Sequence, residues 1–540
     1  MKRYQLLLLS LAAGLLLSLG WPARGFAPLL FLGFVPLLLI ENHFWENRAE
    51  NSRFAITWYS FPAFVLWNLL TTFWIYNSTL QGAIAAIFLN SLFMTMAFTL
   101  FHITRRNAKP GIHGYLALIA YWLSFEYLHL HWDLNWPWLN LGNGFANFHK
   151  WIQWYEYTGT FGGSLWILVV NIFIFMAVRN LMKTRIPGNG FYKHGIIAAA
   201  LIIVPVFVSL LIYSNYQEVK SPISVVVVQP NIDPYKEQYN TPPAEVLGRI
   251  LKLADEKTDS LTDYVIAPES AIQEYVWEDQ IGLSESAGII RQYISEHKHI
   301  DLVVGISSRK LFQPGEKLSQ TARKFSDVDK YYDAYNTALF CDSGSRWQRY
   351  HKSRLTPGVE MMPYPKFFKF AEKYAINLGG TVGSLATDPE RTPFLASSGI
   401  KIAPTICYES AYGEFIAEFV RNGANAIFVI TNDGWWGNTA GHRQHFLFSV
   451  LRAIETRRSV ARSANTGTSA FINQRGDASQ ATAYWVPAVI KQTINTNDRI
   501  TFYVRHGDYI ARASLWAGAF MLLLTIFNGI LKRTPRLKRK

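Results

Sequence analysis

The sequence predicts two kinds of fold in one chain: a multi-span α-helical membrane domain and an α/β domain of layered strands and helices. Long uncharged apolar runs fill the first part of the chain, and short β-branched runs alternating with amphipathic patterns follow them. Only 17% of the 540 residues are charged, fewer than the ~25% typical of soluble proteins. We therefore expect a membrane domain over 1–214, an α/β domain over 215–512, and a transmembrane helix with a basic tail over 513–540.

Eight apolar runs are candidates for membrane-spanning helices. They are Tyr4–Trp21, Phe26–Ile40, Ala55–Tyr76, Ala83–His102, Tyr115–Leu130, Thr158–Val178, Gly195–Tyr213 and Ala513–Leu531. No small-x-small cleavage pattern follows the first run, so we interpret it as a retained span and not as a signal peptide. A crossing takes ~20 residues, so whether Phe26–Ile40 crosses fully stays open.

Lysine and arginine mark one side of the membrane. They concentrate in the alternate connecting segments Glu41–Arg53, Thr104–Gly114 and Arg179–His194 and in the tail after Leu531. Cytoplasmic loops carry such an excess, which places both termini inside and residues 215–512 outside. Since topology explains much of the surplus of 52 Lys+Arg over 38 Asp+Glu, we expect no nucleic-acid partner.

The outer segment alternates strands with helices. The predicted strands are Ile223–Val228, Tyr264–Ala267, Leu302–Ile306, Thr337–Cys341, Ile402–Cys407 and Ala426–Thr431, and the predicted helices are Ala244–Asp255, Ala287–His297, Tyr412–Arg421 and His442–Arg457. This alternation is typical of a layered α/β domain.

Three reactive side chains follow predicted strands or lie in a Pro/Gly-rich stretch. Glu269 ends the run YVIAPES, Lys352 lies in RYHKSRLTPGVE, and Cys407 ends the strand of KIAPTICYES. Such positions display site residues in α/β folds. Together they would make an acyl-transfer site, in which the carboxylate takes the thiol proton and the ammonium stabilises the oxyanion. Taken singly, Cys407 would be interpreted as a buried core residue, and Glu269 and Lys352 as surface charges or members of ion pairs.

The other cysteine and two neighbouring histidines favour structural roles. Cys341, in ALFCDSG, is interpreted as a core residue, and two cysteines are too few for a disulfide scaffold or a cysteine-rich metal site. His442 and His445 are three residues apart without an HExxH motif. We interpret them as part of a surface helix and expect no metal.

The ordered set Glu269, Lys352 and Cys407, in the contexts PES, HKSRLTPGVE and CYES, resembles the Glu-Lys-Cys triad of the nitrilase (carbon–nitrogen hydrolase) superfamily. The runs TNDGWWGNTAGHRQHF and RSVARSANTGTSAFINQRG resemble that superfamily as well. With membrane spans on both sides, and with NWPWLNLGN and YTGTFGGSLWILVVN in the membrane part, the chain is similar to the apolipoprotein N-acyltransferase family. The resemblance covers essentially the whole chain. It implies a nitrilase-like α/β sandwich on the periplasmic side of a bacterial inner membrane.

The resemblance also implies a role for each site residue. Glu269 is the implied general base, Lys352 the oxyanion stabiliser and Cys407 the nucleophile, without a metal or organic cofactor. Supporting positions are Glu360, which orients the lysine, and the pair Tyr408 and Glu409.

Two departures from the family pattern concern the surroundings of the site. Related enzymes often carry a tryptophan after the first strand, where this chain offers Tyr235 or Tyr239, and TPGVE replaces the more usual PFGE. Directly after Glu360, the run Met361–Leu378 is rich in large apolar side chains. It is either a core helix or a lid that dips into the lipid, with Met361, Met362, Phe367 and Phe368 facing the membrane.

The implied reaction has two substrates. An acyl chain passes from a membrane phospholipid to Cys407 as a thioester, and then to the N-terminal amine of the diacylglyceryl-cysteine of an apolipoprotein. One rival is a membrane-tethered amidase that hydrolyses small amides with the same triad. Another is a transporter built around Glu126, an intramembrane carboxylate. Its neighbours His129 and His131 favour a place near the outer interface, where it is hydrated.

Overall fold

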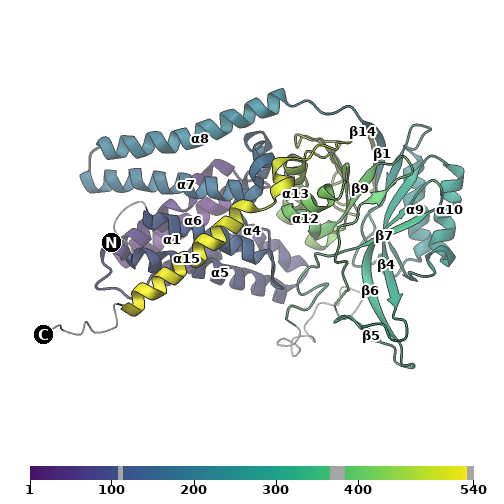
Figure 1. Cartoon of the computed structure of the whole chain (residues 1–540), viewed down its shortest axis with the longest axis horizontal. Helices are drawn as coiled ribbons and strands as arrows, with labels where there is room; N and C mark the ends of the chain where they lie inside the picture. Colours follow the sequence, from purple (N-terminus) through teal and green to yellow (C-terminus); the bar gives the residue numbers. More distant parts are fainter. Residues whose placement is uncertain (108–112, 365–383, 532–540) are drawn as a thin grey trace. The chain divides into compact units, whose positions relative to one another are not determined.

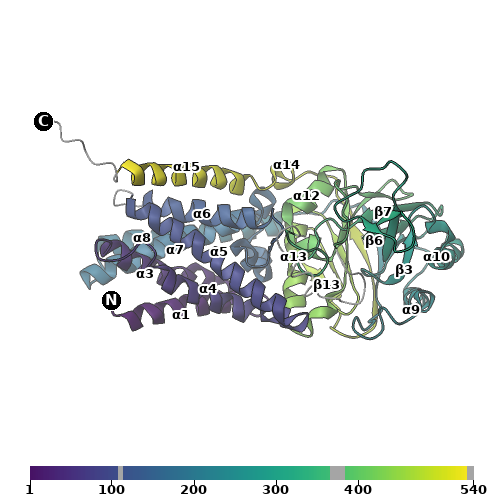
Figure 2. The same cartoon turned by 90° about the horizontal axis from the view of Figure 1, so that it is seen from below.

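The structure is a computed structural model and describes residues 1–107, 113–364 and 384–531. The chain divides into two compact units. One consists of Met1–Tyr76, Leu80–Ser214 and Asp508–Lys540, and the other of Asn77–Thr79 and Asn215–Gly507. Figure 1 and Figure 2 show the first unit as helices and the second as sheets flanked by helices.

Helices make up the first unit. They are α1 (Arg3–Leu19), η1 (Ala27–Leu29), α2 (Leu30–Gly33), α3 (Val35–Glu46), α4 (Thr57–Thr72), α5 (Leu80–Asn107), α6 (His113–His129), α7 (Tyr155–Thr184), α8 (Asn189–Asn215) and α15 (Tyr509–Leu531). Each of the eight predicted runs overlaps one or more of these helices. Among the described residues, five helical stretches are long and apolar enough to cross a membrane: Ala27–Glu46, Leu80–Asn107, Tyr155–Thr184, Asn189–Asn215 and Tyr509–Asn528.

The stretch that begins at Ala27 is broken, and Asn171 of α7 satisfies the backbone at the break. Its Nδ2 donates to the carbonyl oxygen of Leu30 at 2.8 Å, and its Oδ1 accepts from the N–H of Phe34 at 2.8 Å. Backbone groups inside a membrane need partners within the protein. The buried asparagine therefore permits the kink, and the helical stretch continues beyond Ile40 to Glu46.

Glu126 is not exposed to water, so the predicted hydration of its carboxylate is wrong. Its side chain is buried in the first unit, where Oε1 accepts from Trp122 Nε1 at 3.0 Å and from the N–H of Leu141 at 2.7 Å. Leu141 begins η3 (Leu141–Trp151), a segment of 3-10 helix. The carboxylate therefore caps a non-α-helical backbone segment inside the unit.

Two sheets form the second unit. The first has the order β14-β1-β2-β4-β6-β5, with β3 beside β4 and β7 beside β6, and the second has the order β13-β12-β11-β10-β9-β8. The strands of the first sheet are β1 (Pro222–Gln229), β2 (Tyr264–Ile266), β3 (Ile272–Trp277), β4 (Asp301–Leu311), β5 (Arg323–Lys324), β6 (Tyr331–Cys341), β7 (Trp347–His351) and β14 (Ala488–Asn495). Those of the second are β8 (Phe394–Leu395), β9 (Lys401–Ile406), β10 (Ala426–Thr431), β11 (Val460–Ala464), β12 (Ala470–Ile472) and β13 (Ala478–Ser479).

Helices cover the outer faces of both sheets. Figure 1 shows α9 (Pro243–Asp255) and α10 (Glu285–Glu296) on the first sheet, and α12 (Gly413–Arg421) and α13 (Ala440–Thr456) on the second. The two sheets face each other, as the rings of Tyr264 and Phe428 show with centroids 5.3 Å apart. The predicted layered α/β domain thus has four layers, α-β-β-α.

The centre of each sheet is parallel and buried. β1 pairs in parallel with β2 and β2 with β4, while β10 pairs in parallel with β9 and β11. Strands buried on both faces are near-continuous apolar runs, which explains ISVVVV in β1, buried from Ile223 to Gln229. Parallel strands end at the same edge of a sheet, and the loops after them display side chains there.

Candidate active site

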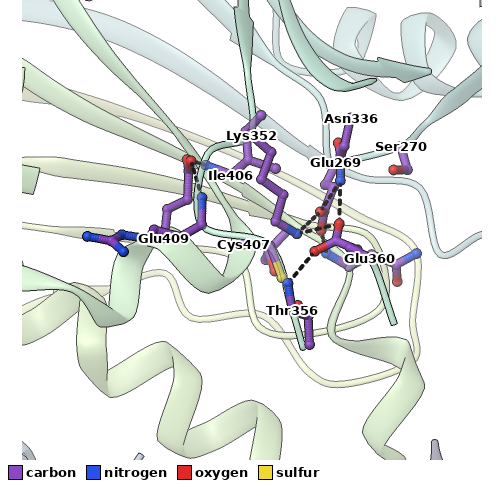
Figure 3. A network of polar contacts seen from close by, with 12 residues as sticks. Glu269, Ser270, Asn336, Lys352, Thr356, Glu360, Ile406, Cys407 and Glu409 are labelled. Carbon is purple, nitrogen blue, oxygen red and sulfur yellow. Dashed lines mark hydrogen bonds and ion pairs between the residues drawn. The ribbon is translucent and has the colours of Figure 1, made fainter. Parts of the chain in front are cut away.

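Three loops that follow strands converge on one pocket. Glu269 follows β2, Lys352 follows β7 directly, and Cys407 follows β9 directly. All three line a pocket of about 170 Å³ in the second unit, together with Asn336 and Glu360 (Figure 3). The structure therefore brings together the three residues that the sequence marks as reactive.

Lys352 is buried between two carboxylates. Its Nζ donates to Oε1 of Glu269 at 2.8 Å and to Oε1 of Glu360 at 2.9 Å, and its side chain is 2% exposed. Burial alone would lower the pKa of the ammonium, but the negative charges of the two glutamates outweigh it and raise that pKa well above its ordinary value. The lysine is therefore a permanent cation in the pocket.

Asn336 of β6 binds the same two carboxylates, and the sequence analysis did not predict it as a site residue. Its Nδ2 donates to Oε1 of Glu269 at 2.8 Å and to Oε1 of Glu360 at 3.0 Å. A third donor to Glu269, besides Lys352 and Asn336, is the N–H of Asn432, 3.1 Å from Oε2. Glu269 is thus oriented by several donors at once (Figure 3).

Glu360 is held as an anion beside the lysine. Its Oε2 accepts from the N–H of Thr356 at 2.9 Å, within the turn that carries it. Burial would raise the pKa of this carboxyl, but the Lys352 charge and the hydrogen bonds lower it. Glu360 therefore balances the charge of Lys352 and fixes the position of its Nζ.

Cys407 is a neutral thiol in a strained backbone position. It is buried, and its φ of 50° lies in the left-handed region, which residues with a side chain rarely adopt. Burial and the Glu269 carboxylate raise the pKa of the thiol, and the Lys352 charge offsets only part of this effect. A nucleophile in this state needs a base at the moment of attack.

Tyr408 and Glu409 are buried but do not line the pocket. Glu409 Oε1 accepts from Tyr350 Oη and from the N–H of Ser353, both at 2.7 Å, and Oε2 accepts from the N–H of Ile406 at 2.8 Å. Burial raises the pKa of its carboxyl to about 7, although these hydrogen bonds oppose the shift. The side chain therefore ties the segment that carries Lys352 to the one that carries Cys407.

Of the two tyrosines offered in place of the family's tryptophan, Tyr239 lines the pocket, whereas Tyr235 lies in a neighbouring surface cavity beside Trp435. Met361 and Met362 directly follow Glu360 but do not line the pocket; both are half-buried, and the N–H of Met362 donates to Ser384 Oγ at 3.1 Å. Phe367 and Phe368 lie outside the described residues, so the lid stays a prediction.

The prediction of a surface helix around His442 and His445 is wrong. Both histidines are buried in α13, and His445 lies 2.8 Å from Asp433 through Nδ1. Among the described residues, the ligand atoms of Cys407, Asp433 and His445 lie within 4.8 Å of one another, close enough in principle to hold a metal ion. Polar side chains can fill this interior because they bind one another.

The arrangement suits acyl transfer through a covalent intermediate. A thiol, a carboxylate and a buried ammonium share one pocket, which is the set required for proton removal, attack on a carbonyl and oxyanion stabilisation. The pocket is smaller than the ~300–1,000 Å³ of sites that enclose a whole drug-sized ligand. A pocket of this size, formed by the described residues, has room for the reacting group of a larger substrate.

Comparisons with known proteins agree with this reading. Residues 224–501 match the carbon–nitrogen hydrolase family, and residues 13–173 match the apolipoprotein N-acyltransferase N-terminal domain. Several curated relatives carry the name apolipoprotein N-acyltransferase, among them two that match nearly the whole chain. The one from Chlorobaculum tepidum is 29% identical over 96% of each chain, and the one from Geobacter metallireducens is 24% identical over 96% of this chain and 95% of its own.

A solved structure with similarity is Saccharomyces cerevisiae Nit3, a member of branch 10 of the nitrilase superfamily. It has a TM-score of 0.36 and 17% identity, and the similarity covers 52% of this chain and 92% of that chain. The family match over residues 224–501 confirms the predicted nitrilase-like α/β fold.

Proposed function

The chain belongs to the carbon–nitrogen hydrolase family, and from this premise we propose that it is a membrane N-acyltransferase that acts on lipoproteins. The N-terminal domain match and the relatives of similar length support acyl transfer over small-amide hydrolysis. The observation that carries the proposal is the single pocket shared by Cys407, Glu269 and Lys352. The acyl donor is a membrane phospholipid, and the acceptor is the N-terminal amine of a diacylglyceryl-cysteine.

In the first half-reaction, Cys407 becomes acylated. Glu269 takes the thiol proton, and the thiolate attacks the ester carbonyl of the phospholipid while Lys352 stabilises the oxyanion. The ester C–O bond then breaks, and Glu269 returns the proton to the departing oxygen. The products are a thioester on Cys407 and a lysophospholipid.

In the second half-reaction, the amine of the apolipoprotein attacks the thioester. Glu269 accepts a proton from the attacking nitrogen, the C–S bond breaks, and the proton returns to the Cys407 sulfur. Glu360, bound to Lys352 at 2.9 Å, keeps the ammonium in place through both steps. Division into two steps lets one small pocket serve two large substrates in turn.

Incubation of the purified protein with phosphatidylethanolamine vesicles tests this function. We expect one lysophospholipid to form per protein, and further turnover only when a diacylglyceryl-cysteine peptide is added. A parallel incubation with small aliphatic amides serves as the comparison. Rapid ammonia release from the amides without any lysophospholipid would identify an amidase instead.

We infer that all eight apolar helices cross the membrane. In this topology residues 1–214 and 513–540 form the membrane domain, and residues 215–512 form the catalytic domain on the periplasmic side of the inner membrane. The concentration of Lys and Arg in alternate connecting segments supports this orientation. It places Cys407 on the side where exported lipoproteins arrive.

Cysteine labelling tests the topology. Cys341 and Cys407 are buried, so a cysteine introduced at exposed Ser326 is expected to react in intact cells with a membrane-impermeant maleimide. The matched control is Lys183→Cys, at an exposed position in the last turn of α7, which should react only after the membrane is permeabilised. The opposite labelling pattern would reverse the orientation.

A further inference from the structure

The backbone of Cys407 needs support because its left-handed conformation is strained. With a φ of 50°, the residue turns the chain sharply from β9 into the 3-10 helix η6 (Cys407–Ala411). A strained backbone conformation of this kind persists only where contacts with surrounding groups hold it in place. What binds the Cys407 peptide group therefore decides where its sulfur lies.

Two donors hold the Cys407 carbonyl. Ser410 Oγ donates to its oxygen at 2.8 Å, and His445 Nε2 lies 3.0 Å from the same oxygen. A carbonyl oxygen only accepts hydrogen bonds, and Ser410 Oγ, which also lies 3.0 Å from Nε2, already donates its proton to that oxygen. We therefore assign the proton to Nε2 of His445, which donates to the carbonyl. This nitrogen is thus committed to the backbone and cannot serve as the base that takes the Cys407 thiol proton.

The other side of the imidazole is anchored by a buried ion pair. His445 Nδ1 lies 2.8 Å from Asp433 Oδ1, and Asp433 Oδ2 accepts from Arg462 Nη2 at 2.6 Å. Thr431 Oγ1 donates to Asp433 Oδ1 at 2.8 Å. The four side chains are fully buried, so the ring is held by Asp433, in the segment after β10, and by Arg462 of β11.

A metal ion fits this cluster less well than the hydrogen bonds do. Arg462 already places a cation 2.6 Å from Asp433 and 3.0 Å from His445 Nδ1. A divalent ion at the same point would be repelled by the guanidinium. A metal ion bound to His445 Nδ1 would also have to replace the contacts that this nitrogen makes with Asp433 and Arg462.

We propose that His445 and Asp433 are positioning residues that fix the Cys407 backbone so that its thiol points into the pocket. Asp433 and Arg462 fix the orientation of the His445 ring, and the ring binds the Cys407 carbonyl. This hydrogen bond stabilises the strained turn between β9 and η6. His445 itself does not line the pocket, so it acts on the rate of attack and not on lipid binding. This proposal rests on the proposed role of Cys407 as the nucleophile.

Paired substitutions of His445 test the proposal. In His445→Gln the amide can still donate to the carbonyl, whereas His445→Met fills similar space without a donor. We expect Met to slow both Cys407 acylation from phosphatidylethanolamine vesicles and its alkylation by iodoacetamide by about 10²-fold, the typical cost of a 1 Å misplacement. Gln should stay within several-fold of the parent, with an unchanged KM for phospholipid in both variants.

The matched controls are His442→Gln and His442→Met. His442 is buried one turn earlier in α13, where it contacts the ring of Tyr484 and lies 3.4 Å from Asn438 Oδ1. Both controls should retain the parent's alkylation rate. If His445→Met fails to fold, Ser410→Ala removes the other donor to the same carbonyl and should itself slow alkylation several-fold.

Defined outcomes would overturn the proposal. His445 would be an ordinary core residue if His445→Gln and His445→Met lost the same amount of rate, in proportion to their loss of thermal stability. Stoichiometric zinc in the purified parent, lost in both variants, would make the cluster a metal site. Alkylation by iodoacetamide needs no lipid, so it tests the position of the thiol separately from acyl transfer. If the variants show the expected alkylation rates but the parent forms no acyl-enzyme, the proposed function is refuted and the positioning role of His445 stands.

Discussion

Cys407→Ala is expected to abolish the acyl-enzyme and lower the transfer rate by about 10⁴-fold or more, as removal of a covalent nucleophile does. The thiol is the only group of the protein that forms a bond to the acyl chain in the proposed reaction. Alanine adopts the left-handed backbone at a cost similar to that of cysteine, so the fold should persist. Intact mass spectrometry after incubation with phospholipid vesicles measures the adduct, and neutral hydroxylamine should release it.

Cys341→Ala is the matched control for this experiment. Cys341 is the other free cysteine, buried at the end of β6, and burial raises the pKa of its thiol to about 12. It does not line the pocket, so the variant should acylate as the parent does. An adduct that persists in Cys407→Ala and disappears in Cys341→Ala would show that Cys341 is the nucleophile and that the assignment to Cys407 is wrong.

The buried parallel strands could be predicted almost residue by residue. The run Ala426–Thr431 is β10 itself, and Ile223–Val228 lies within β1. Strands buried on both faces must be apolar along their whole length, so their sequences alone identify them. The loops that follow such strands carry Glu269 and Cys407, which is why these two side chains could be singled out.

The strand that positions Lys352 could not be predicted. β7 has the polar sequence WQRYH, and it is a strand because it pairs antiparallel with β6 from Thr337 to Cys341. Intrinsic strand preference depends strongly on such tertiary context. Lys352 could be marked by its Pro/Gly-rich surroundings, but its burial between two glutamates required the fold.

The burial of polar side chains could not be predicted from the sequence. Asn336 and His445 look like surface residues in sequence, since side chains of this kind are mostly exposed. Their partners lie far away along the chain: the separation in sequence is 67 positions for Asn336 and Glu269 and 38 positions for His445 and Cys407. Hydrogen-bond satisfaction at that separation is a property of the folded chain, and no local pattern encodes it.

Lys352→Met is expected to slow acylation by at least ~10²–10³-fold, the cost of losing one oxyanion donor. It should also destabilise the protein, because the carboxylates of Glu269 and Glu360 remain buried without their cation. Breaking a buried ion pair typically costs ~3–5 kcal/mol. Stopped-flow acylation with vesicles and thermal unfolding measure the two effects. Lys310→Met, which removes an exposed pair with Glu316, is the control and should change neither.

Adding Glu360→Gln to Lys352→Met separates the two roles of the lysine. The double variant removes one of the two stranded carboxylates, so we expect it to recover part of the lost thermal stability. It should recover none of the acylation rate, since no cation faces the oxyanion. Glu360→Gln alone should slow acylation less than Lys352→Met, because the ammonium keeps its bond to Glu269. Acylation that returns together with stability in the double variant would show that Lys352 supports only the fold, and the oxyanion role would then be wrong.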